Sequence, residues 1–250
     1  MSLEDSILHL VDLLENEENR LDTWIPAAER ERSGNLESWA PKEALAHSAG
    51  WTMRRVANMR RILGGEQPVA YGDYLSLNHQ DFLIYRELSW EQSRQRSREA
   101  RQAVREMLND ISETQLLERD FPPSDDRRPL WKRITGSAVE HPLIHLSMVL
   151  NAIGQPKASA DLQESLARAL RDLDPQDREW QGTVQYNLAC HYALTGQKSR
   201  ALEILREALA LAPELIDWSK KDSDLDALRG EAEYQELLTK SSSPGTSSRP

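Results

Sequence analysis

The feature that most constrains this chain is the spacing of its apolar residues, which recur at three- and four-residue steps along most of its 250 residues. Between residues 3 and 25, for example, Ile7, Val11 and Leu14 lie on one stripe of a helix that Pro26 ends. Alternation with a period of two, which is typical of half-buried strands, is nearly absent. The sequence therefore predicts an all-α protein.

Turn and capping residues divide the first part of the chain into further helices. Pro41 fits the first turn of one helix, and Ser89 with Gln92 forms a capping-box pattern before another. Because the apolar stripes of such helices are buried only against other helices, residues 1–155 are expected to form a four-helix bundle. The predicted segments are 41–63, a shorter piece at 77–88, 89–108 and 130–153, with a loop at 121–126.

The character of the sequence changes after this region. Shorter helices are predicted at 161–173, 176–194 and 199–212, within a second domain at 158–238. Residues 239–250 have almost nothing apolar to bury, so they are expected to form a disordered tail. A chain of this length commonly forms two folding units, which agrees with this division.

Residues 182–213 resemble one tetratricopeptide repeat, in which two antiparallel helices pack closely. Small residues stand where the two helices would touch, at Ala189, Ala201 and Ala208, and larger residues fill the space between them. The remaining matches are Leu188, Tyr192, Gly196 in the turn, Leu205 and the closing Pro213. The resemblance implies either a groove that docks a protein or peptide partner, or a structural buttress that binds nothing.

Composition and charge exclude several classes of partner. With 41 acidic and 31 basic residues the formal net charge is −10, which argues against nucleic-acid binding because that affinity comes largely from neutralising phosphates. No apolar stretch approaches the roughly 20 residues that cross a bilayer, and the N-terminus lacks the pattern of a signal peptide. The single cysteine, Cys190, cannot form an internal disulfide. We therefore expect no membrane partner and a cytoplasmic location.

Two of the six histidines have the spacing of metal ligands. His141 and His145 stand four residues apart, so on a continuous helix both imidazoles project to one face. A third histidine from a facing helix would complete a site with an open position for water or substrate, and His47 lies on the helix predicted at 41–63. Zinc or nickel, the divalent transition metals that suit imidazole best, would lower the pKa of a water ligand there. The remaining histidines, His9, His79 and His191, have no matching partners.

The same region resembles the DinB-like bundle family, including its ClbS/DfsB branch. The matching features are Ser38-Trp39, Leu45-Ala46-His47, Trp51, Asn78, Phe82, Tyr85, Ser89-Trp90 and the pair His141 and His145, and they cover roughly residues 3–155. The resemblance implies a divalent-metal site formed by His47, His141 and His145, and a homodimer through bundle helices. Activities in this family include thiol-dependent transfer and hydrolytic detoxification of reactive small molecules.

One residue departs from the expected pattern, because Pro142 lies between the two paired histidines. Inside a helix a proline removes one backbone hydrogen bond and clashes with the carbonyl four residues earlier, here that of Ala138, at a cost of about 3 kcal/mol. If the helix restarted at Pro142, His141 would only flank it and the site would be distorted. A kink at the proline could equally aim His141 inward.

These features lead to two alternative functions. The first is a metalloprotein that acts on a small-molecule substrate by metal-assisted hydrolysis or transfer. The second is a non-catalytic adaptor that docks a partner through its tetratricopeptide-like unit. No catalytic residue is identified, because Gly-rich phosphate loops, Gly-x-Ser-x-Gly elbows and Cys-x-x-Cys motifs are lacking. Asn78, Asp81 and Tyr85 are candidates for the pocket mouth, and Trp39, Trp51, Trp90 and Trp131 are expected to anchor the core.

Overall fold

The computed structural model describes residues 2–36, 38–119 and 128–240. Within these ranges the chain is all-α and contains no strand; its one extended pairing is an isolated bridge between Asn35 and Ser38. Contacts divide the protein into two compact units, Met1–Leu162 and Gln163–Pro250. The boundary falls inside helix α10 (Pro156–Leu173), a few residues after the predicted one.

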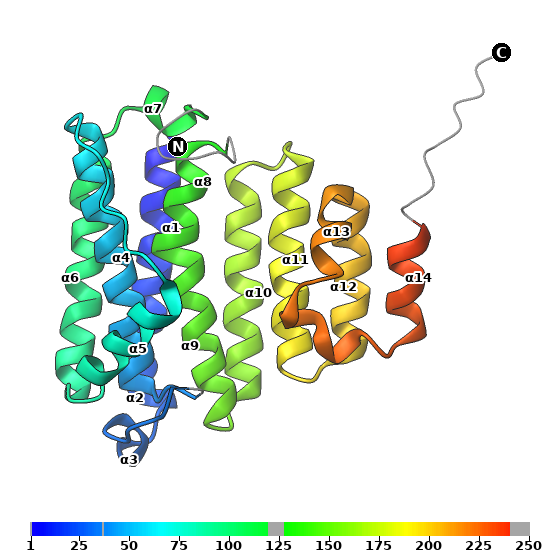
Figure 1. Cartoon of the computed structure of the whole chain (residues 1–250), viewed down its shortest axis with the longest axis horizontal. Helices are drawn as coiled ribbons and strands as arrows, with labels where there is room; N and C mark the ends of the chain where they lie inside the picture. The colour runs from blue at the N-terminus through cyan, green and yellow to red at the C-terminus, as the bar shows by residue number, and fades with distance from the viewer. Residues whose placement is uncertain (1, 37, 120–127, 241–250) are drawn as a thin grey trace. The chain divides into compact units, whose positions relative to one another are not determined.

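Four long helical stretches make up most of the first unit (Figure 1). Helix α4 packs against both α6 and α9, and α1 packs against α6. Fully buried apolar residues lie between them, Ile7, Leu108 and Val139 among them. The long stretches are α1 (Leu3–Asn19), α4 (Pro41–Leu63), α6 (Trp90–Asn109), and a last one made of α8 (Leu130–Thr135), the π-helical turn η1 (Gly136–Glu140) and α9 (His141–Ala152). The short helices are α2 (Leu21–Trp24), α3 (Ala27–Arg30), α5 (Tyr74–Tyr85) and α7 (Glu113–Leu117).

The starts of α4 and α6 follow from their first residues, as predicted. Pro41 occupies the first turn of α4, and the buried Glu43 carboxylate accepts a hydrogen bond from the Ala40 N–H at 2.8 Å. Helix α6 begins with the predicted capping box. Ser89 Oγ accepts from the Gln92 N–H at 3.2 Å, and Gln92 Oε1 accepts from the Ser89 N–H at 2.8 Å.

The first predicted helix is interrupted, because α1 ends at Asn19 and α2 begins at Leu21. Arg20 between them has a ψ of −8°, and its N–H donates to the Glu17 carbonyl, three residues back. Arg20 is the C-cap of α1, and its guanidinium pairs with Glu17 in the last turn at 3.2 Å. The continuous helix that the apolar spacing predicts to residue 25 is therefore interrupted at this residue.

In the second unit, α11 (Arg178–Leu194) and α12 (Lys198–Leu211) form a hairpin. Gly196 in its turn has a φ of 79°, which glycine adopts without a steric penalty. A Cβ on Gly182 would lie 2.4 Å from the Cβ of Ala212, so a larger residue would force the chain apart there. The small residues predicted at the contact between the helices are all fully buried: Ala189, Ala201 and Ala208.

Short elements complete the second unit: η2 (Pro213–Leu215), α13 (Ile216–Ser219), η3 (Ser223–Leu228) and α14 (Ala232–Lys240). Helix α14 includes the first two residues of the tail predicted at 239–250. The rest of that tail and the loop predicted at 121–126 lie outside the described residues. Across the part of the chain that the structure describes, no helix combines the length and the apolar character needed to cross a membrane.

Candidate metal centre

His47 on α4 and the pair His141 and His145 on α9 lie together. One ring nitrogen from each lies within 4.8 Å of the other two, and no other group of metal-binding side chains among the described residues has such spacing. The Nε2 atoms of His141 and His145 are 3.2 Å apart. Two nitrogens bound at 2.0–2.1 Å to a tetrahedral ion lie about 3.4 Å apart, so this pair already has the spacing of two metal ligands.

Pro142 does not break the helix that carries two of these histidines. Glu140 and His141 keep right-handed helical angles, with φ and ψ of −62° and −48° and of −61° and −49°. The turn before them is π-helical, and the His141 N–H donates to the Gly136 carbonyl, five residues back. We attribute this wider turn to the proline ring, which lacks an N–H and would clash with a carbonyl in a regular α-helix. His141 and His145 therefore face the same side of one helix.

Burial keeps all three imidazoles neutral. His47 is only 4% exposed, and burial lowers its pKa to about 2, with smaller contributions from the two other histidines and Arg54. Burial, His145 and Arg55 lower the pKa of His141 to about 3, and burial lowers the pKa of His145 to about 4. Because a metal ion binds the neutral imidazole, protons do not compete for these nitrogens near pH 7.

Aromatic packing holds the His47 ring in place. Trp39 meets it edge-on with ring centroids 4.2 Å apart, and the centroid of Trp51 lies 6.5 Å away. Nδ1 of His47 is buried and has no hydrogen-bond partner. A buried polar atom without a partner is costly, and an ion bound to this Nδ1 would offset that cost. The residues present therefore fit a metal ion.

The four predicted core tryptophans divide into two pairs. Trp90 and Trp131 are buried in the first unit, as expected. Trp39 and Trp51 are only half-buried and stand beside the histidines instead. Their position depends on which residues meet across the helices, which apolar spacing along the sequence does not reveal.

The three side chains considered for the pocket mouth brace α5 against α4. Trp51 Nε1 donates to Asn78 Oδ1 at 3.0 Å. The guanidinium of Arg54 donates two hydrogen bonds, of 2.6 and 2.7 Å, to the Asp81 carboxylate, and Tyr85 is buried. Because both oxygens of the Asp81 carboxylate accept from Arg54, this side chain serves to hold α5 against α4.

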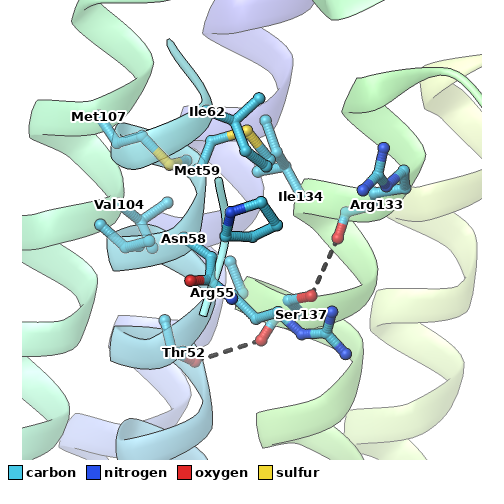
Figure 2. Close-up of a pocket in the computed structure, with 13 residues that line it drawn as sticks. Thr52, Arg55, Asn58, Met59, Ile62, Val104, Met107, Arg133, Ile134 and Ser137 are labelled. Atoms are coloured by element: carbon cyan, nitrogen blue, oxygen red, sulfur yellow. Dashed lines mark hydrogen bonds between the residues drawn. The ribbon is translucent and has the colours of Figure 1, made fainter. Parts of the chain in front are cut away.

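The remaining histidines take no part in this cluster. His9 and His79 are exposed in the first unit, and His191 is buried in the second unit next to Tyr192. What sequence reasoning missed is a cavity of about 90 Å³ that runs along α4 (Figure 2). Its lining comes from α4, from α6, from the continuous stretch of α8 and η1, and from Pro68 in the segment after α4, so no local motif marks it.

No family model, curated protein or solved structure matches this chain. The resemblances to the DinB-like and tetratricopeptide families therefore stay predictions. The candidate metal centre rests on the arrangement and burial of its three histidines.

Proposed function

We propose that this protein binds one divalent transition metal ion, zinc or nickel, through His47, His141 and His145. The observation that carries the proposal is the convergence of three neutral imidazoles from α4 and α9, with ligand atoms within 4.8 Å of one another. Both ions accept imidazole nitrogen, and three protein ligands leave a coordination position open.

The open position supports metal-assisted hydrolysis or transfer on a small molecule, as in the DinB-like proteins that residues 3–155 resemble. A divalent ion held there would supply Lewis acidity to an oxygen of the substrate or of water. The protein's own part is to position the ligands: Trp39 packs against His47, and the π turn before Pro142 aligns the other two rings. Burial of the rings keeps the ligand nitrogens neutral, which is the form that binds a metal ion.

Metal analysis of the purified full chain tests the proposal. After equilibration with zinc or nickel and removal of free ion, we expect about one equivalent per chain. A variant with both His47→Ala and His145→Ala should bind at least about 100-fold more weakly, since even outer-shell substitutions cost 10–100-fold. The matched control is His79→Ala, which removes an exposed imidazole of α5 outside the cluster and should retain the full equivalent.

Circular dichroism must show wild-type helix content in both variants, so that a loss of binding is not a loss of folding. The proposal fails if the wild type binds no ion, or if the folded double variant still binds one equivalent.

The second unit suggests the alternative function. The hairpin of α11 and α12 supports the proposal that residues 182–213 are tetratricopeptide-like, and hence an adaptor that docks a protein or peptide. A wild-type chain that binds no metal, and whose free energy of unfolding is unchanged by chelator, would favour this alternative.

A further inference from the structure

The cavity beside the histidines has an apolar end and a polar end. Figure 2 shows Met59, Ile62 and Ile134 gathered at one end, and Thr52 and Ser137 at the other. At the polar end the Thr52 hydroxyl donates to the Ser137 carbonyl at 3.2 Å. The cavity is thus shaped for a molecule that is apolar on one side only.

The polar end is the end nearer to the histidines. Thr52 follows His47 by five residues on α4, and Ser137 precedes His141 by four on the last helical stretch. At 1.5 Å of rise per helical residue, these separations correspond to about 6–8 Å along the helix axes. A molecule in the cavity therefore lies close to the candidate metal centre.

The volume of the cavity limits the size of the apolar group. An engineered apolar cavity of about 150 Å³ holds benzene, so by proportion a cavity of about 90 Å³ takes roughly three to four carbon atoms. Short alkyl chains of this length fit, and larger ring systems do not.

The lining of the cavity includes the basic side chain of Arg55 and no carboxylate. On α4 the other three arginines are each ion-paired: Arg54 with Asp81, Arg60 with Glu106 and Arg61 with Glu66. Arg55 is exposed at the cavity, and no hydrogen bond or ion pair to it occurs among the residues that the structure describes.

We propose that this cavity binds a small carboxylate, with its alkyl tail of about four carbons between α4 and α6 and its anionic group at Arg55. One guanidinium offers two parallel N–H groups, which match the two oxygens of one carboxylate. A role for this molecule as the acyl part of a substrate rests on the proposed metal function. Its binding does not, because no metal ligand lines the cavity.

This inference is tested by titrating pentanoate into the full chain after treatment with chelator. Acetate, which is three methylene groups shorter, should bind on the order of 50-fold more weakly if the tail is buried. Pentanamide has the same tail without the charge and should bind at least about tenfold more weakly, because a hydrogen bond to a charged group is worth more than one to a neutral group. Binding is measured by calorimetry and by amide chemical shifts, which should change along the lining residues.

Substitutions test whether pentanoate binding depends on the charge of Arg55 itself or on any exposed arginine of α4. Arg55→Gln should weaken pentanoate binding at least about tenfold and leave pentanamide unchanged. The matched control is Arg60→Gln, an exposed arginine of the same helix that does not line the cavity, and it should bind pentanoate like the wild type. Both residues are exposed, so neither change threatens the fold.

The inference is overturned if pentanoate and pentanamide bind equally, if acetate binds as well as pentanoate, or if Arg55→Gln has no effect. The His145→Ala variant distinguishes this failure from failure of the proposed function. It should bind pentanoate normally while losing metal. A protein that binds pentanoate but no metal would reject only the metal proposal, and the converse would reject only this inference.

Discussion

Acidification of the metal-free protein is expected to remove about 2 kcal/mol of stability through His145 alone. Burial lowers the pKa of His145 to about 4, whereas a histidine in an unfolded chain has a pKa of about 6.5. Between these values the unfolded chain binds more protons than the folded protein does. The contribution of His145 to the free energy of unfolding is therefore complete above about pH 6.5, and it decreases progressively as the pH falls to about 4.

The magnitude follows from the distance between the assay pH and the unfolded pKa. At pH 5 the solution is about 1.5 pH units below the pKa of an unfolded histidine, and each pH unit is worth about 1.4 kcal/mol. The folded His145 is still mostly neutral at this pH, because its pKa is about 4. The free energy of unfolding at pH 5 is therefore about 2 kcal/mol lower than at pH 7.5. A variant without the His145 imidazole should not show this loss.

Urea unfolding of chelator-treated protein at pH 7.5 and pH 5 measures this loss. Tryptophan fluorescence reports mainly on the first unit, because five of the seven tryptophans lie there. The free energy of unfolding should fall by about 2 kcal/mol more in the wild type than in His145→Gln. Groups elsewhere, including the buried His191, titrate in both proteins and cancel from the difference.

His79→Gln, which removes an exposed imidazole of the same unit, should keep the pH dependence of the wild type. Equal losses in the wild type and His145→Gln would refute the reasoning. His145 would then titrate alike in the folded and unfolded states, and burial would not be what keeps the ligands neutral.

Two further substitutions test the packing that holds the site. Arg101→Met removes one partner of the buried ion pair with Glu18 and should lower the free energy of unfolding, measured in urea, by about 3–5 kcal/mol. Most of this loss should be recovered when Glu18→Met is added. If Arg101→Met caused no loss, the ion pair would be exposed to solvent. Gly50→Ala places a Cβ 2.2 Å from the Tyr85 hydroxyl and should cost about 1–3 kcal/mol in thermal unfolding, less when Tyr85→Phe is present. An equal cost in both backgrounds would show that Tyr85 is not the obstacle.

The helices could largely be predicted from the sequence because their signals are local. The proline at the start of α4 and the capping box of α6 act within one turn, so each appears in the sequence as it does in the structure. The break at Arg20 is different in kind. Asp22, just after it, accepts a hydrogen bond from Trp90 Nε1 at 3.0 Å and pairs with Arg94 at 3.1 Å, and both partners come from α6. Contacts across about 70 residues leave no periodic pattern to read.

The candidate site could be predicted only in part for the same reason. The spacing of His141 and His145 indicates that they share a helix face, and the structure brings them within hydrogen-bonding distance. Their pKa values depend instead on burial, which is a property of the assembled helices. The edge-on packing of Trp39 on His47 likewise joins a loop to a helix, and its closeness is set by the fold.

Pro142 is a residue whose local chemistry, the lack of a backbone N–H, affects both the histidine cluster and the cavity. Its missing N–H leaves the preceding turn free to widen, and the π turn over Gly136–Glu140 is where the widening occurs. That turn keeps the helix continuous, so His141 stays in register with His145. It also supplies Ser137 and Ala138 to the cavity lining, so this turn connects the cavity to the helix that carries His141 and His145. π-helical turns of this kind frequently occur at functional sites, and the one before Pro142 joins the two candidate sites of this protein.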